Sequence, residues 1–264
     1  MSGGDGTRRC VEQVMGMPIS LALRGRHAAD DAGLRAWHEV LESLREADRL
    51  FSSFRADSFV SRLIRGEEGT DRLPPAVAEV FALGDRAERE SGGAFAIRRP
   101  GPAGGTVLDP CGVVKGWAVE RAAEFLRALD ETDFCLSAGG DMTCRTHDPA
   151  AAPWRIGIEN PLDTSRLVAV VPIHTGAVAT SGTAHRGSHL VDARTGRPPT
   201  GVASVTVIGE SLTWADIDAT AAYARGADAA RWLSSRPDPN FLVVWADGST
   251  ATPGCVGASV VGEE

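Results

Sequence analysis

Apolar residues recur along this chain at two spacings, and the spacings separate predicted helices from predicted strands. Between residues 30 and 51 they lie three and four positions apart, which is typical of an amphipathic helix with one buried face. The same spacing predicts further helices over residues 75–90, 117–129, 214–225 and 227–234. Alternating or short continuous apolar runs predict strands after Pro18 and over residues 134–137, 154–159, 167–174, 204–208 and 241–246.

Turn and capping residues separate these elements. A short helix over residues 60–64 is preceded by Asp57 and Ser58, and either side chain can cap the free backbone N–H groups of its first turn. Pro74-Pro75 stand where the next helix begins, a position at which proline is tolerated. Asp247-Gly248 predict a turn around which two strands pair near the C-terminus.

The order of the elements indicates the fold class. Helices and strands alternate irregularly, and several predicted strands are neighbours in sequence, as in hairpins. That order favours an α+β fold over a doubly wound parallel sheet, so we predict a mixed, largely antiparallel sheet with flanking helices. No repeat and no linker divides the sequence. We therefore expect a disordered N-terminus over residues 1–10 and one domain over residues 11–264.

Composition narrows the classes of function. Of the 264 residues, 43% are hydrophobic and 23% are charged, as in soluble globular proteins with a sizeable core. The formal net charge of −8 argues against nonspecific binding to nucleic acid or to an anionic membrane, which depends on basic patches. It still allows an anionic ligand, because backbone amides and a metal ion can hold phosphates locally.

The cysteines and the N-terminal sequence indicate the cellular compartment of the protein. An odd number of cysteines without a C-x-x-C pair suits neither a zinc site nor a disulfide framework, so we expect reduced thiols. The five cysteines are Cys10, Cys111, Cys135, Cys144 and Cys255. The polar N-terminus has no apolar signal-peptide core, and no apolar run approaches the length of a membrane span. We therefore expect a cytoplasmic protein.

Candidate chemistry is concentrated between residues 180 and 220. Asp216 and Thr220 are four residues apart at the start of a predicted helix, so their side chains project from one face. A carboxylate and a hydroxyl are hard oxygen ligands that suit Mg²⁺, with phosphate and water completing the coordination. The alternative is that Asp216 only caps the helix.

Three glycine-containing segments could accommodate an anionic ligand. Asp109 to Lys115 offers a carboxylate, a glycine in a turn and a lysine before a predicted helix, although the Walker A pattern is absent. Gly139-Gly140-Asp141 follows a predicted strand and could present amides to a phosphate or a sugar. Thr180-Ser181-Gly182 consists of small residues typical of turns. Each segment could equally be an ordinary turn.

His189 and Asp192 are the candidate acid–base residues. They lie close together on a strand-like stretch, and histidine has its reference pKa near neutrality. The alternative is a structural histidine. No G-x-S-x-G elbow surrounds Ser181, so a serine hydrolase is disfavoured.

Taken together and in their order along the chain, several segments of the sequence resemble the ApbE family, the FAD:protein FMN transferases. The resemblance covers about residues 11–226, and its specific blocks are residues 109–115 and residues 189–196. The matching segments are Met15-Gly16, residues 51–63, Gly92-Gly93-Ala94-Phe95, residues 108–120, residues 137–141, Thr180-Ser181-Gly182, residues 189–196 and residues 215–220.

The resemblance implies a single ApbE-like domain that binds FAD and Mg²⁺. It implies that the enzyme cleaves the FAD diphosphate and attaches FMN to a Thr or Ser hydroxyl of an acceptor protein, with release of AMP. The metal would be held by the side chains of Asp216 and Thr220 and by the backbone carbonyl of Gly112, and His189 or Asp192 would act as base. The expected FAD-binding residues are Met15, Phe54, Ala94, Phe95, Ala96, Asp109, Lys115, Gly139, Gly140, Asp141, Thr180, Ser181, Gly182 and His189.

The sequence also departs from the family pattern. Phe54 stands where the family often has Tyr, so stacking is kept and a hydroxyl is lost. Ala96 replaces a common Asp, and Ala193 replaces the usual Pro after Asp192. Many members are exported lipoproteins, whereas this sequence has no lipobox cysteine near a signal sequence, which implies a cytoplasmic member.

Three functions remain open on the sequence. The first is the FMN transferase. The second is a Mg²⁺-dependent FAD pyrophosphatase that releases FMN and AMP, an activity reported for some family members. The third is a non-catalytic FAD-binding protein, which the presence of His189, Asp216 and Thr220 disfavours.

Overall fold

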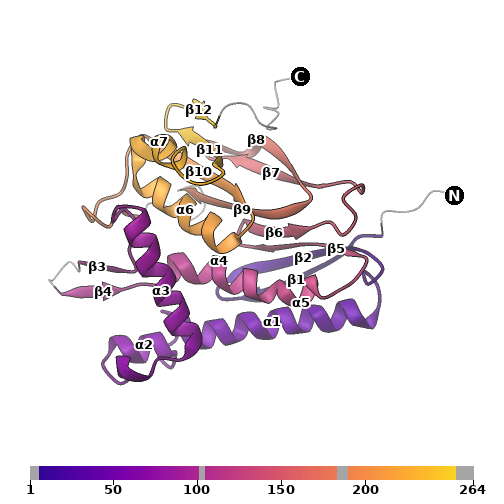
Figure 1. Cartoon of the computed structure of the whole chain (residues 1–264), viewed down its shortest axis with the longest axis horizontal. Coiled ribbons are helices and arrows are strands. Elements are labelled where there is room, and N and C mark those ends of the chain that lie inside the picture. The colour runs from indigo at the N-terminus through magenta and orange to yellow at the C-terminus, as the bar shows by residue number, and fades with distance from the viewer. Residues whose placement is uncertain (1–5, 101–104, 183–189, 254–264) are drawn as a thin grey trace.

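In the computed structural model, which describes residues 6–100, 105–182 and 190–253, the centre of the fold is an eight-stranded sheet (Figure 1). Its strand order is β1-β2-β5-β6-β9-β10-β11-β12, and every neighbouring pair is antiparallel. The strands are β1 (Arg8–Val14), β2 (Met17–Gly25), β5 (Thr132–Ala138), β6 (Asp141–Arg145), β9 (Thr175–Gly182), β10 (Val202–Gly209), β11 (Asn240–Trp245) and β12 (Thr250–Ala251).

Helices and two small hairpins surround this sheet. The helices are α1 (Asp31–Phe51), α2 (Phe59–Ile64), α3 (Pro75–Glu90), α4 (Cys111–Ala122), α5 (Glu124–Arg127), α6 (Leu212–Ala224) and α7 (Ala229–Leu233), with 3₁₀ turns at Thr70–Arg72 and Gly226–Asp228. The hairpins pair β3 (Arg98–Pro100) with β4 (Thr106–Leu108), and β7 (Trp154–Asn160) with β8 (Asp163–Ile173).

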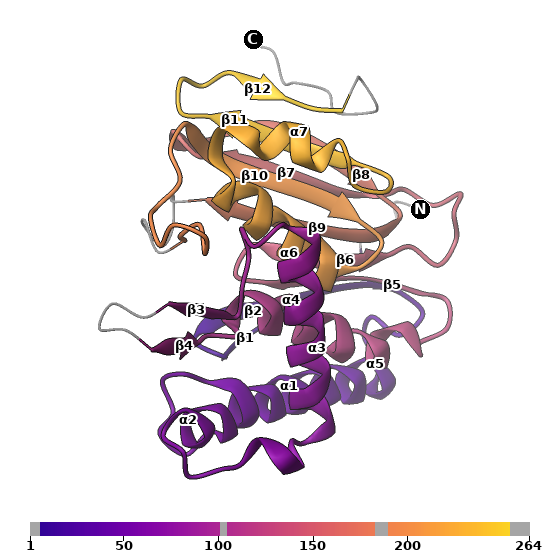
Figure 2. The same cartoon turned by 60° about the vertical axis from the view of Figure 1, so that its left-hand side comes forward.

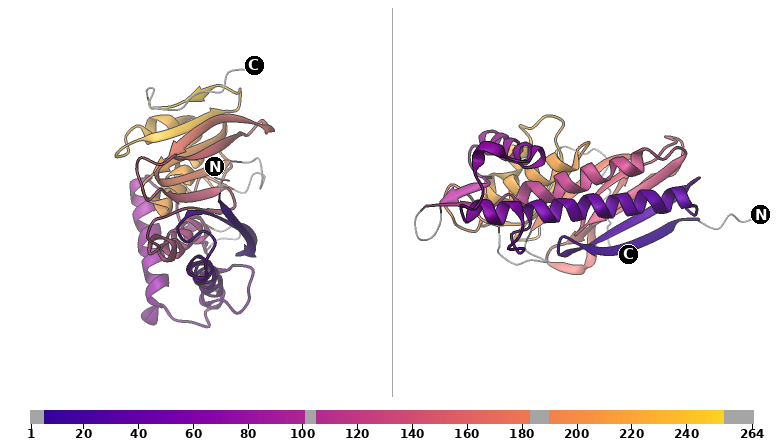
Figure 3. Two further views of the ribbon diagram at one scale, coloured as in Figure 1. Left: turned by 90° about the vertical axis from the view of Figure 1, so that its right-hand side faces the viewer. Right: turned by 90° about the horizontal axis from the view of Figure 1, so that it is seen from below.

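The sheet has a hydrophobic core on each face. Helices α1, α4 and α6 cover one face, and the β7–β8 hairpin covers part of the other (Figure 1, Figure 3). Strand β9 shows the alternation that permits this, because Ala177 and Ala179 belong to the helix-side core and Val178 to the hairpin-side core. Helix α3 runs across α4 towards α6 on the outside (Figure 2). The predicted α+β class with an antiparallel sheet and flanking helices is confirmed.

Most predicted elements are confirmed, but strands β1, β3, β4 and β6 were not predicted and some helix boundaries differ. Helix α4 begins at Cys111 rather than at Trp117, because Pro110 precedes it and Asp109 accepts a hydrogen bond from the Cys111 amide. Of the two candidate caps of α2, Ser58 is the one that accepts from the Ser61 amide.

Both ends of the described chain belong to the sheet. Strand β1 begins at Arg8, so the expectation of disorder is wrong for residues 8–10, whose backbone pairs with residues 21–23 of β2. Residues 1–5 lie outside the described part. The strand pairing predicted around Asp247-Gly248 is confirmed, since β11 and β12 pair there. Across the described residues, no helix combines the length and the apolar character needed to span a membrane.

Candidate functional site

Segments that are far apart in sequence meet at one end of the sheet. The β1–β2 hairpin turns at Met15-Gly16 and the β5–β6 hairpin at Gly139-Gly140, with φ values of 55°, 71°, 57° and 98°. Positive φ at both central residues is what tight two-residue hairpin turns require. The Gly139 amide donates to the carbonyl of Pro18 at 3.2 Å, which ties the two turns together. Beside them, the amide of Thr180 donates to Asp141 Oδ1 at 2.9 Å.

The first turn of α4 is shaped by an aromatic ring. A Cβ atom on Gly112 would lie 2.8 Å from the ring of Phe95, so this helix position needs glycine. Gly112 lies inside helix α4. The sequence analysis predicted a turn before the helix at this position, and that prediction is wrong. Asp109, just before the helix, accepts from the Cys111 amide at 3.2 Å and has Arg99 as its nearest ion-pair partner at 3.7 Å.

Lys115, one turn further along α4, forms ion pairs with two buried carboxylates. Its Nζ atom pairs with Asp141, which follows the β5–β6 turn, and lies 3.2 Å from Asp216 Oδ1 on α6. Asp141 is 1% exposed and Asp216 is 2% exposed. Strand β6, helix α4 and helix α6 thus bring one cation and two carboxylates together, and we call Lys115, Asp141 and Asp216 the ion-pair cluster.

Burial sets the charge states in this cluster. Burial raises the pKa of the Asp216 carboxyl, the Lys115 ammonium lowers it and the Asp141 charge raises it, and the net direction is upward. Burial lowers the pKa of Lys115, but the two carboxylates reverse this and hold the pKa above its usual value. Two carboxylates therefore share one permanent cation, and a second cation placed here would favour their ionised forms.

Asp216 and Thr220 project from one face of α6, as predicted. Asp216 contacts Lys115, and one turn later the Thr220 hydroxyl lies 3.0 Å from the hydroxyl of Ser181 on β9. The alternative in which Asp216 caps the helix is excluded by geometry, because Ser211 is the N-cap and accepts from the Trp214 amide.

Residues 180–182 form the end of β9 and pair with β10, so the turn predicted for this segment is wrong. Alternation along the strand separates its two hydroxyls. Ser181 faces α6, whereas the Thr180 hydroxyl lies 2.9 Å from that of Thr206 on β10. Thr180 therefore reaches the ion-pair cluster through its amide and not through its side chain.

The backbone carbonyl of Gly112 belongs to the first turn of α4, the helix that contacts Asp216. In a regular α-helix the carbonyl of residue 112 faces the amide of residue 116. Here the Gly116 amide donates to Asp216 Oδ2 at 3.1 Å. The helix turn that carries this carbonyl is therefore tied to the Asp216 carboxylate across the α4–α6 contact.

Asp192 lies in a turn, and its carboxylate accepts hydrogen bonds from Arg194, two residues further along the chain. Its carboxylate accepts from Arg194 Nε at 2.9 Å and 3.1 Å and from Nη2 at 2.7 Å, and it also accepts from the Arg194 amide. Burial raises the pKa of Asp192, but these hydrogen bonds outweigh it and lower the pKa overall. A carboxylate held in this way is a weak base. His189, the other candidate base, lies outside the described residues.

The remaining predicted flavin contacts differ in exposure. Phe54 is 98% exposed in the loop after α1, so it is not a core residue. Ala94 is buried and its carbonyl accepts from Ala193 at 3.1 Å, which joins the segment before Phe95 to the Asp192 turn. Ala96 and Met15 are half-buried.

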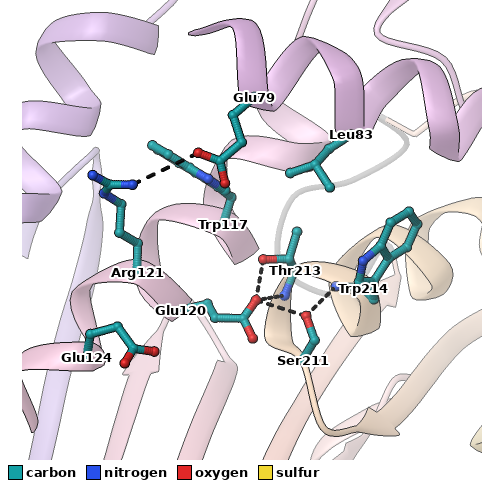
Figure 4. A pocket seen from close by; sticks show the side chains of 9 residues that line it. All are labelled: Glu79, Leu83, Trp117, Glu120, Arg121, Glu124, Ser211, Thr213 and Trp214. Atoms are coloured by element: carbon teal, nitrogen blue, oxygen red, sulfur yellow. Dashed lines mark hydrogen bonds and ion pairs between the residues drawn. The ribbon is translucent and has the colours of Figure 1, made fainter. Parts of the chain in front are cut away.

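Glu120 is a residue whose role the sequence analysis missed. Its Oε2 atom accepts from Ser211 Oγ at 2.9 Å, from the Thr213 amide at 3.1 Å and from the Thr213 hydroxyl (Figure 4). A carboxylate on α4 thereby satisfies the free N-terminal donors of α6. The sequence could not indicate this role, because Glu120 on α4 contacts Ser211 and Thr213 at the start of a different helix, α6.

Figure 4 also shows a pocket beside this carboxylate, distinct from the ion-pair cluster. It has a volume of about 310 Å³ between α3, α4 and α6. Glu79, Glu120 and Glu124 line it, with Arg121 the single cation among its lining residues. This acidic lining is unsuited to a diphosphate.

The donors at the cluster fit a magnesium ion. Over the described residues, no group of three or more His, Cys, Asp and Glu side chains is placed to hold a metal. Mg²⁺ does not need such a group, because it takes few protein oxygens and completes its shell with water and phosphate. A buried carboxylate, a hydroxyl and a helix carbonyl are oxygen donors of that kind.

The use of lysine in the sequence also marks this site. Lys115 is the only lysine in a chain whose other basic residues are arginines. A compact ammonium is a point charge, whereas the guanidinium of arginine is a planar fork. The one lysine lies between two buried carboxylates, which indicates that arginine would not serve there.

The sequence is similar to those of known proteins. The model of the ApbE family matches residues 98–245, more than half of the chain. A relative from Vibrio cholerae named FAD:protein FMN transferase is 31% identical over 131 residues, covering 46% of this chain and 39% of the relative. One from Rhodobacter capsulatus with the same name is 29% identical over 191 residues, covering 69% of this chain and 32% of the relative. The matches thus span well under half of these relatives.

Solved structures show the same fold. The ApbE protein of Thermotoga maritima superposes with a TM-score of 0.80 at 20% identity, over 94% of this chain and 97% of that one. The apo form of the flavinyl transferase ApbE from Pseudomonas stutzeri gives 0.78 at 21% identity, over 94% and 95%.

Proposed function

This chain belongs to the ApbE family, and from that premise we propose that it is a Mg²⁺-dependent FAD:protein FMN transferase. The proposed reaction cleaves the FAD diphosphate, joins FMN to a Thr or Ser hydroxyl of an acceptor protein and releases AMP. The observation that carries the proposal is the ion-pair cluster beside the Ser181–Thr220 hydroxyl pair. The name shared by the similar proteins supports the same reaction.

We assign the metal to the Asp216 and Thr220 side chains and to the carbonyl of Gly112. These groups come from two packed helices, and the Gly116 amide fixes the orientation of the Asp216 carboxylate. When bound, Mg²⁺ neutralises charge on the phosphoryl oxygens of FAD.

Lys115 and the turn at Gly139-Gly140 would hold the FAD diphosphate. Lys115 is 19% exposed, so its ammonium can contact a ligand while it keeps its carboxylate partners. The space beside Gly140 is open, with nothing within 4 Å of the position of a Cβ atom. The Gly139 amide already donates to Pro18, which leaves Gly140 as the residue of this turn that a phosphate can approach.

The acceptor hydroxyl must lose its proton to attack the phosphorus atom. We propose His189 as the base, because its reference pKa suits proton transfer near neutral pH. Asp192 is the weaker candidate, because Arg194 occupies both of its oxygens.

Intact-protein mass spectrometry of an acceptor tests the proposed reaction. The acceptor carries a Thr or Ser flavinylation site and is incubated with the protein, FAD and Mg²⁺. We expect a gain of one FMN per acceptor, release of AMP and no gain without Mg²⁺. FAD hydrolysis with an unchanged acceptor would identify a pyrophosphatase, and FAD bound but intact would identify a binding protein. Either result would contradict the transferase.

Asp216→Asn tests the metal assignment within this reaction. We expect the Mg²⁺-dependent rate to fall about 100-fold or more, because losing roughly 3 kcal/mol of charge stabilisation has that effect. Asp218→Asn is the matched control on the same helix, where Asp218 pairs with Arg236 at 3.0 Å and not with the cluster. The melting temperature of each variant separates unfolding from lost catalysis. Equal rates in the two variants would refute the assignment.

A further inference from the structure

Cys135 and Cys144 face each other across the β5–β6 hairpin. The strand register places them directly opposite, and their Sγ atoms lie 3.2 Å apart. Both are free thiols; Cys135 is half-buried and Cys144 is 2% exposed. They are nine residues apart, so only the hairpin register reveals the pair.

The hairpin places the two thiols at a position where a disulfide can form. The two-residue turn is closed by the pair Ala138–Asp141, and in such turns the closing pair exchanges backbone hydrogen bonds. Hydrogen-bonded and non-hydrogen-bonded pairs alternate from there, so the cysteine pair, three positions away, is non-hydrogen-bonded. Side chains are closest in such pairs, whose Cα atoms lie about 4.5 Å apart, within the range of roughly 4.4–6.8 Å that disulfides span.

Small side chains lie beside the two thiols on their face of the sheet. The register aligns Arg9, Ala22, Cys135, Cys144 and Gly176 in one row across five strands. Directly opposite side chains share a face of the sheet, so small neighbours flank the two sulfurs. The hydrogen bond from Cys144 lowers the pKa of Cys135, burial opposes this, and the charge of the exposed Arg9 lowers it further.

We propose that Cys135 and Cys144 form a redox-active dithiol that closes reversibly to an intramolecular disulfide, with a low-molecular-weight disulfide such as oxidised glutathione as the oxidant. This assigns a modification site on the sheet face opposite α4 and α6, and it does not depend on the transferase reaction.

The chemistry proceeds in two exchanges. The Cys135 thiolate, the more exposed of the two, attacks one sulfur of the oxidant, forms a mixed disulfide and expels a thiolate. Cys144 then gives up its proton, attacks the Cys135 sulfur and expels the second glutathione as thiolate. The protein loses two electrons and two protons, and the oxidant becomes two thiols.

The test is peptide mapping of the full-length protein after incubation with oxidised glutathione. We expect a linked Cys135–Cys144 peptide pair, a mass lower by about 2 Da per chain, and full reversal by reduced glutathione. Cys135→Ser and Cys144→Ser should each abolish the link, and Cys144→Ser should leave the more exposed Cys135 as a mixed disulfide. Cys111→Ser, which removes an exposed thiol elsewhere, should keep the link.

Two results would overturn the proposal. One is a Cys135 that stays reduced, or stops at the mixed disulfide, under conditions that modify Cys111. The other is an intramolecular disulfide that still forms in Cys135→Ser or in Cys144→Ser, which would show that the remaining cysteine pairs with a different one. Thermal unfolding of each variant confirms that the fold is intact, and Cys135→Ala provides a second substitution at the same position.

Discussion

At the scale of single residues, Lys115 is the side chain on which the site depends. Its side chain is 19% exposed and pairs with two carboxylates that are almost fully buried. Breaking a buried ion pair by removing one partner costs far more than the pair contributes when intact, because the remaining charge is left without compensation. Substitution of this residue therefore tests how the cluster balances its charge.

We predict that Lys115→Met lowers the free energy of unfolding by about 3–5 kcal/mol in the absence of metal. Mg²⁺ should raise the melting temperature of this variant more than that of the unaltered protein, because the ion would supply the missing positive charge. Lys115→Arg keeps the charge with a different shape and should be destabilised less. The interpretation fails if Lys115→Met unfolds at the same temperature as the unaltered protein, with or without Mg²⁺.

Part of the site could be predicted at the residue scale. The four-residue spacing of Asp216 and Thr220 sets one helix face and was sufficient to place the two side chains together. The partner Ser181 was placed in a turn, because small residues do not show that β10 pairs with them. Glu120 and the Cys135–Cys144 pair could not be found, since their contacts are set by helix crossing and strand register.

At the scale of elements, the contact between α4 and α6 positions the residues that we propose as metal ligands. Gly116 lies where the helices touch, and a Cβ atom there would be 2.8 Å from the Leu212 carbonyl and 3.0 Å from both Thr213 Cα and Asp216 Cβ. Two of these atoms are backbone, so they cannot move aside independently of the helix. Glu120 joins the same helices one turn later through the α6 N-terminus.

We predict that Gly116→Ala pushes α4 and α6 apart, costs about 1–3 kcal/mol of stability and weakens Mg²⁺ binding. The better helix propensity of alanine offsets only part of this cost. Gly209→Ala is the control, because nothing lies within 4 Å of a Cβ atom at that position. Calorimetric titration with Mg²⁺ and thermal unfolding give both readouts. Unchanged affinity in Gly116→Ala would show that the helix spacing does not position Asp216.

The carboxylate cap of α6 gives a separate prediction. Glu120→Gln keeps the size of the side chain and removes the charge that faces the helix N-terminus, so we expect a loss of about 1–2 kcal/mol. Glu124→Gln is the matched control, since Glu124 lines the same pocket but is exposed and pairs with Arg127 on its own helix. Urea denaturation measures both. Similar midpoints for the two variants would mean that the cap contributes nothing to stability.

Element boundaries show what local pattern can and cannot predict. Helix α1 and helix α3 follow from strong apolar periodicity and were placed within a residue. Helix α4 was started six residues late, because its first turn contains Gly112, which resembles a turn until the Phe95 ring is seen against it. The order of the strands in the sheet could not be predicted from local pattern, because β2 pairs with β5 across more than a hundred residues.

At the scale of the whole molecule, His27 links two distant segments. Its Nδ1 atom lies 2.8 Å from Asp30 and its Nε2 atom 2.8 Å from Asp130, on either side of the β2–β5 pairing. Hydrogen bonds from the His27 ring to Asp30 and to Asp130 raise the pKa of His27. Because the pKa of His27 is raised in the folded state, protonated His27 stabilises the fold fully at pH values below its unfolded pKa of about 6.5. This stabilisation is lost as the pH rises through the pKa of His27 in the folded protein.

We therefore predict that the melting temperatures of the unaltered protein and His27→Gln differ at pH 5.5 and converge by pH 9. His38→Gln on the exposed side of α1 is the control and should show no such convergence. Scanning calorimetry at several pH values gives the comparison. A difference that is constant with pH would mean that the His27 charge has no role.

The account as a whole depends on the ion-pair cluster being the place where FAD and Mg²⁺ bind. Because the sequence contains a single lysine, protein labelled with ¹⁵N-lysine gives one side-chain ammonium signal, that of Lys115. The most direct measurement is the NMR titration of this signal with FAD in the presence of Mg²⁺. The account predicts that the signal shifts and saturates together with FAD binding. An unchanged Lys115 ammonium signal at saturating FAD would contradict it.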